Sequence, residues 1–270
     1  MTERNLFLLG LGNQKCGTSW LHKYLGESPN FRGGVAKEYH VWDALDNPLK
    51  KDSLVSWKAG FIGMPIKMRR YRMQRKPSHY FDYFSSLYSD TVTVTADITP
   101  SYSGLEPARL TYIQDEFDRK GVDTKAIILI REPVARIKSA VRYCLDRKNY
   151  REGITSGETD FFRAARQYFQ SPHCQYRTNY HVSIENALKV FGEEDLYVGL
   201  YETMFSAEEI ERVSKFCNLP VNTEYASVRV NKTKSKVAED EALEAEIRAA
   251  YQPVYDYCYE RFPETRELWA

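Results

Sequence analysis

Short, mostly apolar runs alternate with amphipathic stretches along most of the chain. Runs of this kind are typical of strands buried on both faces of a sheet. They occupy residues 6–11, 91–95, 125–130 and 196–201, with a shorter one near 34–36. Between them, apolar residues recur every three or four positions, which predicts helices over 18–26, 105–120, 133–148, 160–170, 177–191 and 207–217. A last helix is expected over 239–261, kinked at Pro253 because proline removes a backbone hydrogen bond.

This alternation predicts an α/β fold with a mainly parallel central sheet flanked by helices on both faces. The chain has 270 residues and no internal repeat, so a single domain over residues 1–270 is expected. Residues 42–90 fit the alternation poorly and are expected to form an insertion on the substrate side of the sheet.

The insertion contains a basic run, residues 67–76, with six lysines and arginines in ten positions. It has two interpretations, which the sequence leaves open. The run is either a solvated helix face or a cationic wall for an anionic substrate, in which Arg70 and its neighbours Arg69 and Arg72 would contact that substrate.

Residues 5–25 combine an apolar run, a glycine-containing loop and a helix. The backbone N–H groups of such a loop and the N-terminal end of the next helix bind phosphate, and Lys15 adds a positive charge. Gly12 and Gly17 have the separation found in a Walker A loop, but the lysine precedes the second glycine instead of following it. The pattern therefore predicts a nucleotide-phosphate site and argues against an ordinary Mg²⁺-dependent NTPase. The alternative is a tight turn with a solvated lysine.

A second candidate phosphate site follows the apolar run at 125–130. Arg131 stands at the carboxyl end of this predicted strand, where open α/β sheets bind ligands. Pro133 suits the first turn of the next helix, and Ser139 lies about two turns further on. Arg131 is expected to bind a second phosphate, although a structural ion pair is an equal alternative for this residue alone.

Four segments together resemble the sulfotransferases that use 3′-phosphoadenylyl sulfate (PAPS). KCGTSWL at 15–21 is similar to the 5′-phosphosulfate loop of that family, and LIREPVARIKSAV at 129–141 to its 3′-phosphate segment. KEYHVWD at 37–43 and ADITPSYS at 96–103 resemble two segments of its glycan-modifying and bacterial branch. The resemblance implies the sulfotransferase form of the P-loop-containing nucleotide-hydrolase fold.

The resemblance also implies which residues bind the nucleotide. The expected set is Lys15, Cys16, Gly17, Thr18, Ser19, Trp20, Arg131, Ser139, Lys232 and Thr233. Lys232 and Thr233 belong to a polar basic stretch, 229–236, for which a charged linker is the alternative. The chain departs from the family at Ile98, where many relatives carry lysine. A contact that relatives make there is therefore absent or supplied elsewhere.

Sulfuryl transfer requires a base for the acceptor and positive charge for the leaving oxygen. Lys15 is the expected source of charge. Glu38 matches the catalytic glutamate of the resembling segment and is the expected base; His40 is the rival, since imidazole titrates near neutral pH. Asp97, at the end of a predicted strand, is a third candidate base, with a capping or structural role as the alternative. Lys37 and Asp97 are also expected to contact substrate.

The composition excludes fewer classes of binding partner than the motifs do. The net charge of +1 selects neither nucleic acid nor an acidic membrane surface, and no apolar run is long enough to span a bilayer. Five cysteines without a paired motif favour a reducing compartment, and the early start of the fold leaves no room for a signal peptide. A cytoplasmic enzyme without a metal is expected, acting on a small-molecule or carbohydrate acceptor. A P-loop kinase and a non-catalytic nucleotide-binding protein remain as alternatives, and the oligomeric state is open.

Overall fold

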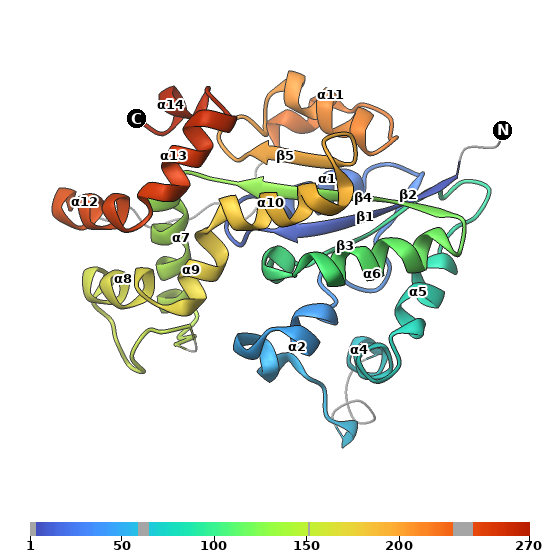
Figure 1. Ribbon diagram of the computed structural model, residues 1–270, viewed down its shortest axis with the longest axis horizontal. Coiled ribbons are helices and arrows are strands. Elements are labelled where there is room, and N and C mark those ends of the chain that lie inside the picture. The colour runs from blue at the N-terminus through green and yellow to red at the C-terminus, as the bar shows by residue number, and fades with distance from the viewer. Residues whose placement is uncertain (1–3, 59–64, 151, 229–239) are drawn as a thin grey trace.

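The computed structural model describes residues 4–58, 65–150, 152–228 and 240–270. Within them, a five-stranded, all-parallel sheet has the strand order β2-β3-β1-β4-β5 (Figure 1). The strands are β1 (Asn5–Gly12), β2 (Phe31–Arg32), β3 (Val94–Ile98), β4 (Val122–Ile130) and β5 (Leu196–Leu200). The predicted α/β class and the parallel sheet are confirmed.

Helices cover both faces of this sheet (Figure 1). The first half of the chain contributes α1 (Thr18–Leu25), α2 (Trp42–Asp46), η1 (Pro48–Ser53), α4 (Pro65–Arg75), α5 (Ser78–Ser85), η2 (Pro100–Gly104) and α6 (Pro107–Asp118). The second half contributes α7 (Pro133–Asp146), α8 (Phe161–Phe169), α9 (Pro172–Thr178), α10 (Tyr180–Phe191), α11 (Ala207–Phe216), η3 (Thr223–Ser227), α12 (Glu241–Ala250), α13 (Gln252–Arg261) and α14 (Thr265–Leu268).

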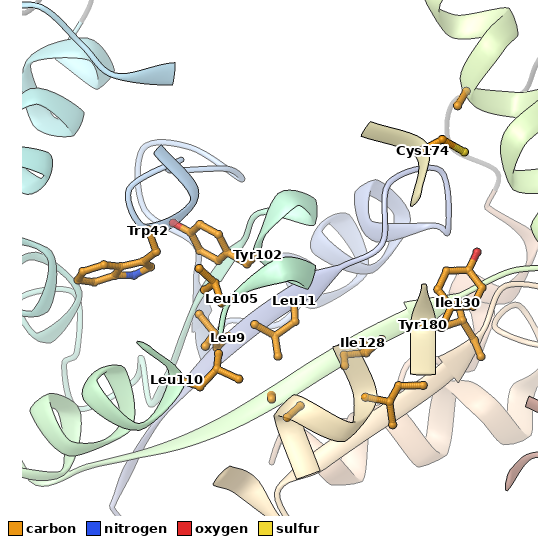
Figure 2. Close-up of a cluster of buried hydrophobic side chains, with 14 of the residues drawn as sticks. Leu9, Leu11, Trp42, Tyr102, Leu105, Leu110, Ile128, Ile130, Cys174 and Tyr180 are labelled. Atoms are coloured by element: carbon orange, nitrogen blue, oxygen red, sulfur yellow. The ribbon is translucent and has the colours of Figure 1, made fainter. Parts of the chain in front are cut away.

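The central strand β1 divides the core into two apolar layers because successive side chains of a strand point to opposite faces. Leu6 and Leu8 pack with α1 and α11 on one face. Leu9 and Leu11 pack on the other face with residues of β4, η2 and α10, as Figure 2 shows for part of this layer. A strand that is buried on both sides is apolar throughout, which is why the sequence pattern identified it.

Several predicted boundaries are wrong. β4 starts at Val122 rather than at residue 125, and the helix expected over 177–191 starts at Tyr180, after α9. β3 starts at Val94 rather than at residue 91, because a turn precedes it: the N–H of Ser89 donates to the carbonyl of Val92, and the N–H of Val92 donates to the hydroxyl of Ser89. The short strand lies at 31–32 and not at 34–36. The interruption expected at Pro253 is present: the last predicted helix is two helices that meet at Tyr251, with Pro253 in the first turn of α13.

The insertion is helical over its described part, with α2, η1, α4 and α5 between β2 and β3 (Figure 1). It overlaps the end of the KEYHVWD segment, and its first helix, α2, contacts η2, which follows the carboxyl end of β3. This edge of the sheet also holds the loop after β1 and the start of α7 after β4. The tertiary structure therefore brings the four predicted motif segments to one edge.

Candidate active site

Two glycines allow the loop between β1 and α1 to turn. Gly12 and Gly17 have φ angles of +117° and +94°, in the region that other residues rarely adopt. A Cβ atom at Gly12 would lie 2.6 Å from the carbonyl oxygen of Pro100, and one at Gly17 would lie 2.3 Å from the sulfur of Met204. The loop is fixed to β4 by Asn13, whose backbone N–H donates to the carbonyl of Leu129 over 2.8 Å.

The loop presents unpaired donors at the N-terminus of α1. No described residue accepts a hydrogen bond from the backbone N–H groups of Gly17, Thr18 or Ser19. These groups belong to the end of the helix that favours negative charge. The predicted anion-binding character of this loop therefore has a structural basis.

Lys15 and Arg131 lie next to each other at this edge. The Arg131 guanidinium donates to the carbonyl oxygen of Lys15 over 3.3 Å and covers the ring of Tyr201 at 4.2 Å. The Lys15 ammonium lies 4.6 Å from the ring centre of Tyr143. Burial, and then the charge of Arg131, lower the pKa of Lys15. Neither cation forms an ion pair with a described residue, so both charges are available to a bound anion.

Beside Arg131, a cavity of about 450 Å³ is lined by Tyr201, Phe205 and Trp269 among others. Ser139 is nearly buried on α7, and no hydrogen bond within the described ranges joins it to Arg131 or to the loop. The contact of Ser139 with a phosphate therefore stays a prediction.

Two residues expected to bind the nucleotide are buried in the core instead of facing this edge. The thiol of Cys16 is fully buried near the hydroxyl of Tyr180, and burial raises its pKa to about 12. The indole of Trp20 stacks on Tyr24, and its N–H donates to the carbonyl of Val228 over 3.0 Å. Cys16 can contribute only through its backbone, and the side chain of Trp20 acts in packing.

Lys232 and Thr233 lie outside the described residues. Val228, one residue before that stretch, is placed beside α1 by its hydrogen bond from Trp20.

The phosphate loop is also fixed from α9, which the sequence did not indicate. The buried guanidinium of Arg177 donates to the side-chain oxygen of Gln14 over 2.9 Å and forms an ion pair with Glu152, with a second contact of 2.7 Å. These three residues are far apart in the chain and follow no recognisable spacing. An isolated arginine or glutamate gives no signal of such a pairing.

Lys37 joins the loop to the candidate base. Its ammonium lies 3.1 Å from the hydroxyl oxygen of Thr18, 3.4 Å from that of Ser19 and 2.7 Å from a carboxylate oxygen of Glu38. The sequence suggested a contact of Lys37 with substrate or sulfate but did not reveal this bridge. The bridge places Glu38 next to the phosphate loop, which the sequence could not show.

Glu38, His40 and Asp43 form a hydrogen-bonded relay. The imidazole Nε2 of His40 lies 3.2 Å from the second carboxylate oxygen of Glu38, and its Nδ1 lies 2.8 Å from Asp43. Asp43 is fully buried and also accepts a hydrogen bond from Ser101. Sequence reasoning missed Asp43, because His40 lies before α2 with a left-handed backbone and no helical spacing links the two residues.

Against the effect of burial, the hydrogen bonds of this relay lower the pKa of Glu38 and raise that of His40. Burial opposes ionisation of Glu38, but the hydrogen bonds from His40 and Lys37 outweigh it and lower the pKa to about 2. Burial likewise disfavours the imidazolium of His40, but Asp43 and Glu38 raise its pKa to about 9. At neutral pH Glu38 is therefore an anion and His40 a cation. A protonated imidazole cannot accept a proton, which favours Glu38 as the base.

Asp97 does not face this site. Its carboxylate is fully buried and accepts hydrogen bonds from Thr99 at 2.5 Å, Tyr102 at 2.9 Å and Tyr80 at 3.0 Å. Burial raises its pKa to about 6. It also accepts a hydrogen bond from the backbone N–H of Tyr39. The structural alternative for Asp97 fits this environment, and a direct contact with substrate does not.

Ile98 and Arg70 also differ from the expected picture. The side chain of Ile98 is buried and apolar, so it offers no polar contact to a substrate. Its backbone N–H donates to the carbonyl of Lys37. Arg70 donates over 2.5 Å to the backbone carbonyl of Glu38, not to an open surface. Its neighbours Arg69 and Arg72 line a separate cavity of about 450 Å³ between α4 and α5.

The described residues contain no group of three or more histidine, cysteine or carboxylate side chains arranged to hold a metal ion. None of their helices is both long and apolar enough to cross a membrane. All five cysteines are buried and unpaired.

Comparison with known proteins identifies the fold. No family model matches the chain, and no curated protein matches it in sequence. Among solved structures, a sulfotransferase from Alicyclobacillus acidocaldarius is 22% identical over 94% of this chain and 93% of that one, with a TM-score of 0.57. The sulfotransferase domain from the curacin biosynthetic pathway is 16% identical over 82% and 76% of the two chains, with a TM-score of 0.50. The chain therefore has the fold of the sulfotransferases.

Proposed function

We propose that this protein is a sulfotransferase that moves a sulfuryl group from PAPS to a hydroxyl or amine of a small-molecule or carbohydrate acceptor. The observation that carries the proposal is the position of Lys37, which touches both the phosphate loop through Thr18 and the candidate base Glu38. A phosphate loop and a carboxylate base would otherwise be two unrelated features. Their junction is the arrangement that transfer from a phosphosulfate to an acceptor requires.

The site has the features that PAPS needs. Unpaired N–H groups at the start of α1, together with Lys15 and Lys37, would hold the phosphosulfate end. Arg131 would bind the 3′-phosphate, with Ser139 as a second donor, and the aromatic-lined cavity beside Arg131 would take the nucleoside. Lys15 at one end and Arg131 at the other form no ion pair with a described carboxylate, whereas Lys37 is shared with Glu38.

Each residue then has a defined task. Glu38 accepts the proton of the attacking hydroxyl or amine as the new bond to sulfur forms and the bond between sulfur and the leaving phosphate oxygen breaks. Lys15 and Lys37 stabilise the negative charge that develops on that oxygen. His40 keeps Glu38 in place through its own hydrogen bond, and Asp43 fixes the imidazole in turn.

The acceptor would approach beside Glu38, and the basic helix α4 is the nearest cationic element of the insertion to that residue through Arg70. If Arg69 and Arg72 contact an anionic part of the acceptor, their replacement by methionine raises the acceptor KM and leaves nucleotide affinity unchanged. An unchanged KM would indicate that the two arginines lie on a solvated helix face and do not contact the acceptor. We further propose that the protein acts in the cytoplasm, consistent with its five unpaired cysteines.

Two experiments test the function. Calorimetry in EDTA compares 3′-phosphoadenosine 5′-phosphate, AMP and ATP; the first ligand should bind much more tightly than the other two. Incubation with ³⁵S-labelled PAPS and a metabolite pool, followed by mass spectrometry, should yield a labelled acceptor.

The alternatives give different results in the same experiments. A P-loop kinase would prefer ATP and require Mg²⁺ for binding. A non-catalytic nucleotide-binding protein would bind the bisphosphate nucleotide tightly and label no acceptor.

A further inference from the structure

Helix α4 lies along the segment that carries Glu38 and His40. Two of its side chains reach that segment: Arg70 donates over 2.5 Å to the carbonyl of Glu38, and Gln74 donates through Nε2 over 2.7 Å to the carbonyl of His40. Residues four positions apart lie on the same face of a helix. One face of α4 therefore binds two alternate carbonyl groups of the segment.

The opposite edge of the segment is bound to the end of β3. The backbone N–H of Tyr39 donates to the hydroxyl of Thr99 over 2.9 Å, and that of Val41 donates to the hydroxyl of Tyr102 over 3.1 Å. The segment is thus held on both edges, as a strand is held between two neighbours. The backbone held in this way places the imidazole Nε2 of His40 3.2 Å from a carboxylate oxygen of Glu38.

His40 has an unusual backbone that makes this support necessary. Its φ angle is +51°, in the left-handed region that non-glycine residues adopt only when the surroundings enforce it. The hydrogen bond from Gln74 is made to the carbonyl of this same residue. Losing that bond would let the backbone relax and rotate the imidazole away from Glu38.

Gln74 is itself fixed. It is nearly buried, its Oε1 accepts a hydrogen bond from the N–H of Val55 over 2.9 Å, and its Nε2 also donates to the carbonyl of Ser53 over 3.1 Å. All polar atoms of its amide group are engaged by backbone. A buried, fully bonded amide between two chain segments has the rigidity that a positioning residue needs.

We propose that Gln74 is a positioning residue that keeps His40 and Glu38 in hydrogen-bonding contact. The basic run that contains Gln74 thereby fixes the backbone of the segment that carries the base. This role does not depend on what its arginines contribute to acceptor binding. Only the naming of Glu38 as the base rests on the proposed function; the contact between His40 and Glu38 does not.

The test is a titration of the His40 imidazole by NMR in the full-length protein. The signal is assigned by its absence in His40→Asn. The groups that face this ring are Glu38, Asp43 and Ser101, with Lys37 and Lys50 acting through the two carboxylates. In the wild type the ring should titrate near 9 because of its two carboxylate partners. In Gln74→Met the midpoint should fall by about one pH unit or more, toward the ordinary value for histidine.

Met73→Leu is the matched control, because Met73 is equally buried on the same helix but faces the cavity between α4 and α5. Its His40 titration should equal that of the wild type. If Gln74→Met does not fold, Gln74→Asn replaces it: the amide is kept, but it is too short to reach the carbonyl of His40. A folded Gln74 variant with an unchanged titration would overturn the proposal.

Kinetics separate this proposal from the proposed function. With an identified acceptor, Gln74→Met should lower kcat by about tenfold or more while the affinity for 3′-phosphoadenosine 5′-phosphate stays within about twofold. A wild type that transfers no sulfuryl group, combined with a shifted titration in Gln74→Met, would refute the function and leave the positioning role intact. An active wild type, combined with an unchanged His40 titration in Gln74→Met, would support the function and refute the positioning role.

Discussion

The ammonium of Lys37 lies 2.7 Å from the carboxylate of Glu38 and 3.1 Å from the hydroxyl of Thr18. One cation is therefore shared between the candidate base and the phosphate loop. While it pairs with Glu38, it lowers the pKa of that carboxyl and weakens it as a base. An anion bound at the loop would compete for the same ammonium. Glu38 would become more basic when the sulfuryl donor is present.

Lys37→Met should lower kcat by about 10²–10³, the scale for losing one donor to a developing oxyanion. Lys15→Met should have an effect of similar size because it removes the second cation. Lys23→Met is the control, since Lys23 carries the same charge and is exposed on α1, the helix that follows the loop of Lys15. Steady-state rates at saturating PAPS measure the effect. Full activity of Lys15→Met would contradict the assignment of the phosphosulfate loop.

The pH dependence distinguishes the two candidate bases. Glu38 must be deprotonated to accept a proton, and its pKa of about 2 makes kcat/KM nearly flat between about pH 5 and 8. Neutral His40 is the form that accepts a proton, and its pKa of about 9 would make the rate rise about tenfold per pH unit over that range. Glu38→Gln should lower kcat by about 10²–10⁴ with nearly normal PAPS binding. A sloping wild-type profile together with an active Glu38→Gln would transfer the role to His40.

The same pKa values predict how the relay affects stability. The pKa of His40 is raised on folding, so its contribution is complete below about pH 6.5 and is lost as the pH rises through about 9. The pKa of Glu38 is lowered, so its contribution is complete above about pH 4.5 and is lost as the pH falls toward about 2. The free energies of urea unfolding of His40→Asn and wild type should therefore differ most between about pH 4.5 and 6.5. A stability difference that grows above pH 9 would contradict the relay.

Arg131→Met should weaken binding of 3′-phosphoadenosine 5′-phosphate by about 1.5–3 kcal/mol, the range for hydrogen bonds to charged groups. Ser139→Ala should weaken it less. Neither change should affect AMP, which lacks the 3′-phosphate. Arg119→Met provides the control, because Arg119 is an exposed arginine at the C-terminal end of α6, paired with Glu116. Calorimetry that shows an equal loss for AMP would mean that Arg131 supports the loop and not the 3′-phosphate.

Arg177→Met should destabilise the fold by about 3–5 kcal/mol, since it leaves the carboxylate of Glu152 buried without its partner. It also removes the donor to Gln14 in the phosphate loop, so nucleotide affinity should fall as well. Arg163→Met, which removes an exposed arginine paired with Glu158, should cost far less. Urea denaturation measures both. Equal effects of the two variants would contradict a structural role of the buried pair.

Local patterns were sufficient for the framework of the fold and for the position of the glycine loop after β1. The apolar run of β1, the glycine loop with Lys15 and the following helix are contiguous, so their arrangement follows from short-range geometry. Arg131 could be placed because the end of a buried strand is visible in the sequence, and parallel strands end at one edge of a sheet.

The choice among three candidate acid–base residues depended on tertiary structure. Asp97 and Glu38 are both carboxylates near the edge of the sheet, but Asp97 points into the core among tyrosines while Glu38 meets Lys37. His40 is charged because Asp43 and Glu38 both contact it. No periodicity in the chain reports which way a side chain outside a regular element will point.

The supporting contacts were invisible for the same reason. Gln74 reaches His40, and Arg177 reaches Gln14, over sequence separations that leave no local trace. A single glutamine or arginine is compatible with a solvated surface until the elements pack. The sequence by itself thus determined the α/β framework, the phosphate loop and the candidate chemistry, because these depend on neighbouring residues. Only the tertiary structure decided which carboxylate faces the loop and what holds it there, because burial and charge pairing arise between segments that are distant in the chain.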